Sequence, residues 1–109
     1  MSKLRLIFID GNEVTRALFG YVLEGSSGIE VVGEAADHRS AMALIRQYGP
    51  DAIIIGYDLL PGEESELRHN LGIEFPQTQI IELSELDKTV KSKMTQRITR
   101  QYPYSRMVH

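Results

Sequence analysis

The chain has 109 residues, of which 42% are hydrophobic and 25% charged, and its formal net charge is −3; this is the composition of one ordinary globular domain. The absence of cysteine excludes a disulfide scaffold, a thiolate metal site and a cysteine nucleophile. No apolar run is long enough to cross a bilayer, and the first residues lack the pattern of a signal peptide. We therefore expect a cytoplasmic protein without a membrane segment.

The sequence alternates between short apolar runs and amphipathic segments of helical spacing. The run Leu4–Ile9 is typical of a strand buried on both faces, and Asn12 and Asp37 are residues that cap helices. In chain order we predict a strand at Leu4–Ile9, a helix from Glu13 to the glycines and serines of 25–28, a strand at Ile29–Gly33, a helix after Asp37 through Tyr48, a strand at Asp51–Ile55, a helix from about Glu63 to Glu74, a strand at Gln79–Leu83, and a helix after Asp87 to about Arg100.

This order predicts right-handed βαβ units and therefore an α/β fold with a doubly wound parallel sheet. A fifth strand is at best the tail Tyr102–Val108, because Pro103 confines such a strand to a sheet edge or to its first positions. No residues then remain for a helix after the fifth strand, so we expect an atypical C-terminal end.

Charge is distributed unevenly along the chain. Residues 84–109 have a net charge of +4, whereas residues 1–83 have a net charge of −7. The basic segment is either a solvated helix face or a contact surface for an acidic partner. The negative total and the absence of a DNA-binding helix-turn-helix argue against direct binding of nucleic acid.

In a parallel sheet of this kind, function is expected at the carboxyl ends of the strands. Asp10, Asp58 and Ser84 meet there, and two carboxylates with a hydroxyl suit Mg²⁺ and a phosphoryl oxygen. The alternative is that Asp10 and Ser84 only shape turns. Glycine-rich nucleotide motifs are absent, and the three histidines have no metal-ligand spacing, so each is expected on the surface.

Several of these segments resemble the receiver domains of response regulators, in particular those of the NarL/FixJ type. The resemblance rests on Arg5–Asp10, on residues 15–24, on Ile29–Ala36, on Pro50-Asp51 before an apolar strand, and on Pro76–Ser84. It covers about residues 4–87, and residues 88–109 diverge as a basic helix and tail. It implies one receiver-like domain over residues 1–109, with a flavodoxin-like sheet of four to five strands that lacks the last helix.

The resemblance also implies where an active site would lie. Active receivers hold Mg²⁺ with an acidic pair after the first strand and bind the phosphoryl group with a Ser or Thr after the fourth strand and a Lys after the fifth. Asp10 matches the first acid and Ser84 the hydroxyl, but the second acid falls on Gly11. The lysine position falls near Arg106, and arginine does not replace lysine at a buried point contact.

The phosphoacceptor aspartate of the family is also missing from its expected place. Its position falls on Gly56 when counted forward from Pro50, and on Tyr57 when counted back from Pro61-Gly62. Neither residue forms an acyl phosphate. Asp58 follows one or two positions late and is the alternative acceptor.

These departures predict a degenerate receiver, or pseudo-receiver. We expect a protein-protein interaction or dimerisation module of a signalling pathway that acts without phosphorylation and is not an enzyme. No cofactor is expected, because Asp10 alone would hold Mg²⁺ weakly. The alternatives are an active receiver phosphorylated on Asp58, or a small-molecule sensor of the same fold.

A homodimer is also expected. Without the last helix, the strands Leu4–Ile9 and Ala52–Ile55 would leave apolar side chains facing water, and a large apolar patch seldom stays exposed. The basic helix and tail would then make the contact between subunits. The interaction residues predicted there are Lys91, Met94, Ile98, Tyr102 and Tyr104.

Overall fold

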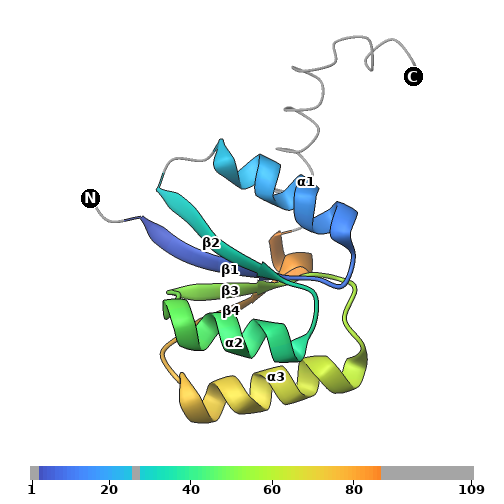
Figure 1. Cartoon of the computed structure of the whole chain (residues 1–109), viewed down its shortest axis with the longest axis vertical. Coiled ribbons are helices and arrows are strands. Elements are labelled where there is room, and N and C mark those ends of the chain that lie inside the picture. The colour runs from blue at the N-terminus through green and yellow to red at the C-terminus, as the bar shows by residue number, and fades with distance from the viewer. Residues whose placement is uncertain (1–2, 26–27, 87–109) are drawn as a thin grey trace.

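The structure is a computed structural model that describes residues 3–25 and 28–86 (Figure 1). Strands and helices alternate along this part of the chain, as the sequence predicted. The elements are β1 (Leu4–Ile9), α1 (Glu13–Glu24), β2 (Ile29–Ala35), α2 (His38–Tyr48), β3 (Ala52–Ile55), α3 (Pro61–Glu74), β4 (Gln79–Glu82) and a 3-10 helix, η1 (Leu83–Leu86). The predicted helix after Asp87, the tail strand and the interaction residues between Lys91 and Tyr104 lie outside the described residues.

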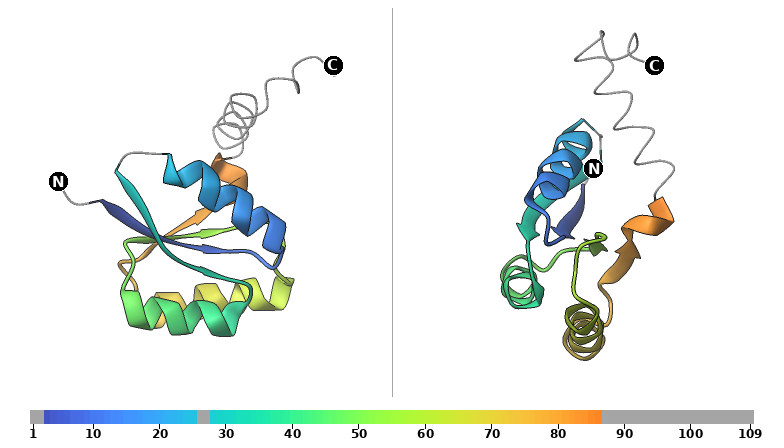
Figure 2. Two further views of the ribbon diagram at one scale, coloured as in Figure 1. Left: turned by 45° about the horizontal axis from the view of Figure 1, so that its top comes forward. Right: turned by 90° about the vertical axis from the view of Figure 1, so that its right-hand side faces the viewer.

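The four strands form one parallel sheet in the order β2-β1-β3-β4. Helix α1 covers one face of this sheet, and α2 and α3 lie side by side on the other face (Figure 2). The doubly wound α/β fold is therefore confirmed. The central strands β1 and β3 bring their carboxyl ends together, since Ile9 pairs with Ile55.

Four element boundaries differ from the sequence prediction, the smallest difference being that β3 begins at Ala52 rather than Asp51. β2 ends at Ala35, two residues beyond Gly33. Its pairing with β1 is irregular just before Gly33, where Val32 is left without a partner. α3 begins at Pro61 rather than Glu63, because proline suits the first turn of a helix, where its missing N–H is not needed. β4 ends at Glu82, and the chain turns there into η1.

Two hydrophobic clusters form the core, one on each face of the sheet. On the α1 face, the Phe8 and Phe19 rings stack with their centroids 4.1 Å apart. The cluster under α2 and α3 is larger because two helices cover that face. Its buried members are Ile7, Ile9, Ala35, Ala41, Met42, Ile45, Ile53, Ile55, Leu67 and Leu71.

The expectation that β1 and β3 expose apolar side chains is wrong. Leu4 is 42% exposed, but every other residue of β1 apart from the half-buried Arg5, and all of β3, is buried. On the α1 face the reason is that Phe19 and Leu23 of α1, together with Leu83 of η1, pack over Leu6, Phe8, Ala52 and Ile54. The argument for a homodimer from these strands is therefore lost.

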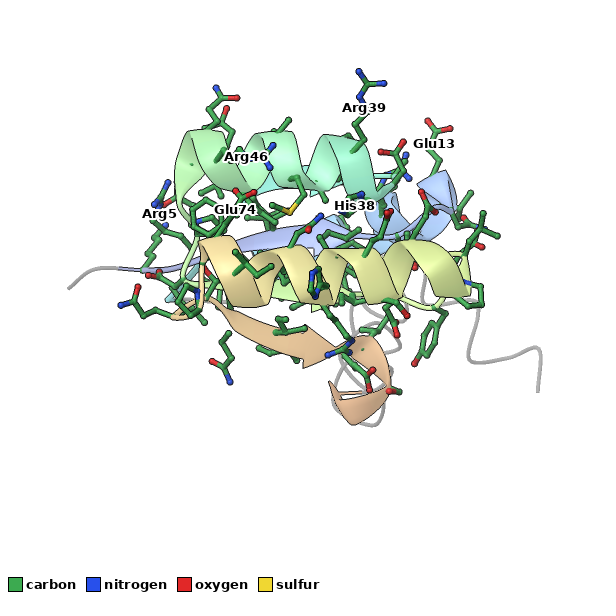
Figure 3. All side chains as sticks on the ribbon, turned by 90° about the horizontal axis from the view of Figure 1, so that it is seen from below. Arg5, Glu13, His38, Arg39, Arg46 and Glu74 are labelled. Atoms are coloured by element: carbon green, nitrogen blue, oxygen red, sulfur yellow. The ribbon has the colours of Figure 1, made fainter. Side chains whose placement is uncertain are left out.

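Polar contacts hold α2 against α3 (Figure 3). Arg46 donates two hydrogen bonds to the Glu74 carboxylate, at 2.9 and 2.8 Å, and this donation lowers the pKa of Glu74. Near the start of α2, His38 Nε2 lies 2.9 Å from Asn70 Nδ2 and its Nδ1 lies 3.6 Å from Glu66 Oε2. His38 is thus half-buried between two helices rather than on the open surface where we expected it.

The cap of α2 gives a pH-dependent prediction. Asp37 Oδ1 accepts the Ser40 backbone N–H at 2.8 Å, and this bond lowers the pKa of Asp37 below its ordinary value of 3.8. Asp37→Ala is expected to cost about 1 kcal/mol of unfolding free energy at neutral pH. Since the folded-state pKa is depressed, the cost is fully present above pH 3.8 and disappears as the pH falls through the folded value.

Urea unfolding of both proteins over a range of acidic pH measures this difference. Asp37→Asn is the control, since asparagine caps a helix equally well without a charge. A cost of Asp37→Ala that stayed constant down to the most acidic condition would contradict the assignment to the ionised carboxylate.

Candidate functional site

Asp10 lies at the carboxyl end of β1 and is completely buried, with 0% of its surface exposed. Its Oδ1 accepts the backbone N–H of Asn12 at 2.7 Å, and its Oδ2 accepts the backbone N–H of Tyr57 at 3.0 Å. Hydrogen bonds to an ionised carboxylate are stronger than those between neutral groups. The Asp10 carboxylate therefore ties the loop after β1 to the loop after β3.

Further hydrogen bonds join the same two loops. The Gly11 N–H donates to the Asp58 carbonyl oxygen at 2.6 Å, and the Gly56 N–H donates to the Ile9 carbonyl oxygen at 2.8 Å. Arg16, one turn into α1, reaches back and donates from Nη1 to the Asp10 carbonyl oxygen at 2.6 Å. The two loops are thus closed onto each other through backbone groups as well as through the Asp10 side chain.

Gly56 is the residue that makes room for the Asp10 carboxylate. A Cβ atom at position 56 would fall onto Asp10 Oδ2 and would lie 2.7 Å from Cγ and 2.9 Å from Cβ of Asp10. These are separations that packed atoms do not adopt, so any side chain here requires Asp10 or the backbone to move. Position 56 is one of the two positions where the resemblance places the phosphoacceptor. The Asp10 carboxylate already occupies the space that a side chain there would need.

Gly11 is similarly enclosed. A Cβ atom at this position would lie 2.5 Å from the Asp58 carbonyl oxygen and 3.4 Å from Asp58 Oδ2. The close approach permits the hydrogen bond from the Gly11 N–H to Asp58. A carboxylate at position 11, where the resemblance places a second metal ligand, would require the loop after β3 to shift.

The residues present do not fit a Mg²⁺ site of the kind that the resemblance implies. Both oxygens of Asp10 already accept backbone N–H donors, and the side chain is completely buried, whereas a Mg²⁺ ion in a protein site usually keeps several waters. Among residues 3–25 and 28–86, no group of three or more His, Asp or Glu side chains is arranged to hold a metal ion.

Three further residues predicted for the site are exposed, unlike the buried Asp10. Tyr57 and Asp58 are exposed in the loop after β3, with the Asp58 carboxylate beside Gly11. Ser84 is exposed in η1, beyond β4, and contributes none of the hydrogen bonds to the Asp10 carboxylate described above. The structure therefore brings Asp10, Gly11, Gly56 and the backbone of Tyr57 together, while Ser84 stands apart.

Sequence reasoning treated Asp10 mainly as a remnant metal ligand. Its bond to the Asn12 N–H, two residues ahead, is the Asx turn that was the alternative, and the signal for it is the spacing of Asp10 and Asn12. The bond to Tyr57 and the Arg16 contact were missed, because nothing local in the sequence indicates which loop will lie across the edge of the sheet.

No protein-family model matches the chain, but individual relatives do. The oxygen regulatory protein NreC of Staphylococcus aureus is 28% identical over 85 residues, which are 77% of this chain and 39% of NreC. The chain thus spans about two fifths of the length of the curated relatives it matches. Of the described helices, none has the length and apolar character needed to span a membrane.

Solved structures agree with this relationship. The receiver domain of a NarL response regulator from Mycobacterium tuberculosis superposes with a TM-score of 0.67 at 25% identity, over 75% of this chain and 66% of that one. A LuxR-family response regulator from Aurantimonas gives 0.67 at 25% identity, over 74% and 58%. The resemblance to response-regulator receiver domains of the NarL/FixJ type is confirmed, and with it the flavodoxin-like fold.

Proposed function

We propose that this receiver domain acts without phosphorylation, as a cytoplasmic protein-protein interaction module in two-component-type signalling. The observation that supports the proposal best is the position of Asp10. Its buried carboxylate accepts two backbone N–H groups and fills the space that a side chain at position 56 would need. An acid that serves this structural purpose is not free to bind a metal ion or a phosphoryl group.

Electrostatics favour the same proposal. An acyl phosphate adds negative charge beside existing carboxylates, and a divalent cation or a lysine must offset that charge. Position 11 is glycine, and no lysine occupies the expected place near Arg106. A phosphoryl group on Asp58 would therefore lie beside Asp10 without the cations that stabilise it in active receivers.

The proposal predicts that phosphoryl donors leave the protein unchanged. Incubation with acetyl phosphate, or with beryllofluoride, and millimolar Mg²⁺ is expected to give no phosphoryl adduct by mass spectrometry. Mg²⁺ alone is expected to leave the melting temperature and the amide NMR signals of Gly11 and Tyr57 unchanged, since ligand binding to the folded state would raise the melting temperature.

Asp58→Asn serves as the matched control for this experiment. An adduct that forms on the natural protein and is lost in Asp58→Asn would overturn the proposal and establish the active-receiver alternative. A saturable Mg²⁺ response centred on Asp10 and Asp58 would count against it in the same way.

A further inference from the structure

Asp10 is the only one of the five aspartates in the chain that precedes a glycine. An aspartate in this position is chemically labile, because glycine has no Cβ to shield its backbone nitrogen, and that nitrogen can attack Cγ of the aspartate to close a five-membered succinimide ring. The other aspartates precede histidine, alanine, leucine and lysine, whose side chains hinder the attack. In the unfolded chain Asp10 is therefore the aspartate most prone to this reaction.

The folded structure requires the glycine that makes Asp10 labile. A Cβ atom at position 11 would lie 2.5 Å from the Asp58 carbonyl oxygen, so a side chain there would force apart the two loops that meet at Asp10. Glycine permits the hydrogen bond from the Gly11 N–H to Asp58, and it also leaves its own nitrogen unshielded. Packing and chemical stability therefore place opposite demands on position 11.

The closed loops restrain both reacting groups. The Gly11 N–H, whose nitrogen would attack, donates to the Asp58 carbonyl oxygen at 2.6 Å. The two Asp10 oxygens accept the N–H groups of Asn12 and Tyr57, so an oxygen that left Cγ would also give up its donor. The Asp10 side chain is completely buried, which keeps out the water that a succinimide needs in order to open.

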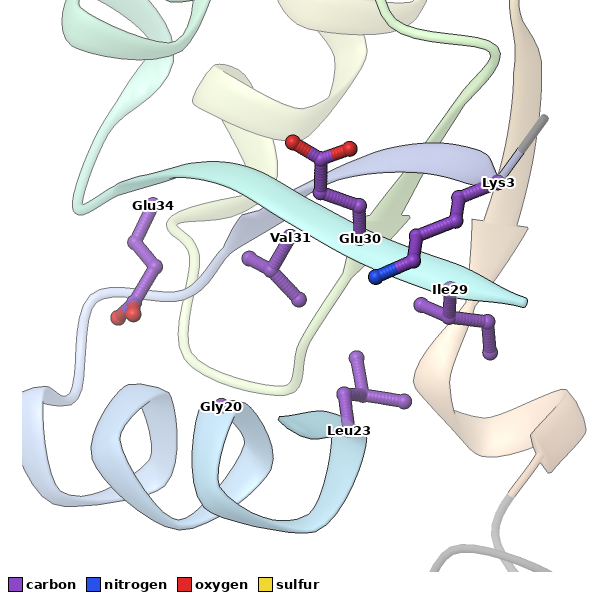
Figure 4. Close-up of a pocket in the computed structure, with 7 residues that line it drawn as sticks. All are labelled: Lys3, Gly20, Leu23, Ile29, Glu30, Val31 and Glu34. Atoms are coloured by element: carbon purple, nitrogen blue, oxygen red, sulfur yellow. The ribbon is translucent and has the colours of Figure 1, made fainter. Parts of the chain in front are cut away.

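A pocket of about 310 Å³ between α1 and β2 does not relieve this burial (Figure 4). It is lined by Gly20 and Leu23 of α1, by residues 29–31 and Glu34 of β2, and by Lys3. Asp10, Gly11 and Asp58 are not among the residues that line it. Exposure of the Asp10 carboxylate to water therefore requires the loops after β1 and β3 to separate.

We propose that Asp10 is a site of isoaspartate formation, and that the hydrogen bond from Gly11 to Asp58 prevents the reaction until the loops open. In the open state the Gly11 nitrogen bonds to Asp10 Cγ, and one carboxyl oxygen leaves as water with the N–H proton and a proton from solvent. Water then adds to the main-chain carbonyl carbon of Asp10 and breaks its bond to the Gly11 nitrogen. The new carboxyl group returns a proton to solvent, so the mass of the chain is unchanged.

The rearranged residue does not restore the site. The backbone of isoaspartate runs through the former side chain and is one methylene group longer, and its carboxylate is attached at Cα. This carboxylate is displaced from the N–H groups of Asn12 and Tyr57, so the two loops of a converted molecule no longer close in the same way. The inference is independent of phosphorylation, because Asp58 takes part through its main-chain carbonyl group.

The first test compares conversion in the folded and the unfolded chain. The natural protein is incubated at neutral pH in buffer and in concentrated urea, and isoaspartate is measured with an isoaspartyl methyltransferase and assigned to its peptide by mass spectrometry. Conversion at Asp10 is expected to be at least about tenfold slower in the folded protein, because only the open fraction reacts. Equal rates in the two conditions would overturn the proposal.

Hydrogen exchange of the Gly11 amide measures the same opening independently. Loops open and close much faster than succinimides form, so the rate of conversion follows the open population. The factor by which folding slows conversion is therefore expected to equal the protection factor of the Gly11 N–H to within about threefold. A clear departure from the protection factor in either direction would overturn the assignment to the bond between Gly11 and Asp58.

A variant that opens the loops completes the test. Gly56→Ala introduces a Cβ atom 2.7 Å from Cγ of Asp10, and it is expected to raise the rate of conversion in buffer about tenfold. Gly72→Ala in α3 is the matched control, since a Cβ atom there meets nothing within 4 Å, and it is expected to keep the natural rate. Circular dichroism verifies the fold of both variants, and the exchange measurement on the natural protein decides the question if Gly56→Ala does not fold. Equal rates in the two folded variants would overturn the proposal.

Discussion

Gly56→Ala is expected to lower the unfolding free energy by about 3 kcal/mol, the range found when a side chain is forced into a filled site. The added Cβ would lie 2.7 Å from Cγ of Asp10, a residue that is completely buried. Relief requires either a shift of the backbone after β3 or loss of the Asp10 hydrogen bonds. Urea unfolding at neutral pH measures the change.

Gly72→Ala is the matched control for this substitution. Gly72 lies in α3, and a Cβ atom there meets nothing within 4 Å, so alanine is expected to leave stability unchanged or to raise it by up to about 1 kcal/mol. If Gly56→Ala proved as stable as Gly72→Ala, the Asp10 carboxylate would be free to swing aside, and the steric argument would fail.

Asp10→Ala is expected to lower the unfolding free energy by a similar amount, about 3 kcal/mol, because it removes hydrogen bonds rather than adding a steric clash. The substitution removes the acceptor of the partly buried N–H groups of Asn12 and Tyr57, and a donor that is left unsatisfied there carries a desolvation penalty. Asp10→Asn keeps the shape but supplies only one acceptor oxygen, so its unfolding free energy is expected to lie between those of the natural protein and Asp10→Ala. A fully stable Asp10→Ala protein would show that the two loops do not depend on this carboxylate.

The two substitutions are coupled, and their combination separates steric from polar effects. In the Asp10→Ala background the carboxylate that Gly56→Ala meets is gone, although the Cβ of residue 10 would still lie 2.9 Å from the new methyl group. The unfolding free energy of the double variant is therefore expected to exceed the value given by adding the two single losses, by about 1 to 2 kcal/mol. Strict additivity would contradict a direct contact.

The fold could be predicted because its signals are local. Leu4–Ile9 is an uninterrupted apolar run, and Asn12 and Asp37 cap the helices that the sequence assigned to them. The order of these elements, together with the preference for right-handed crossovers, leaves few topologies. The resemblance to receiver domains indicated the same arrangement by an independent route.

The site could be predicted only in part, because its geometry depends on contacts between distant residues. The sequence drew attention to Asp10 as the remaining acid, and to Gly11 and Gly56 as places where acids are missing. That Gly56 accommodates Asp10, 46 positions earlier in the chain, follows from the pairing of β1 with β3.

The contact between Asp10 and Gly56 also bears on how this chain can change over generations. An aspartate introduced at position 56 by a single mutation would collide with the buried Asp10 carboxylate, and the protein would lose stability whatever chemistry the new side chain offered. A domain whose total stability is about 5 to 15 kcal/mol has little to spare for such a step. A side chain at position 56 would therefore require a second change, at Asp10 or in the loop after β3, so this contact limits which single substitutions the site accepts.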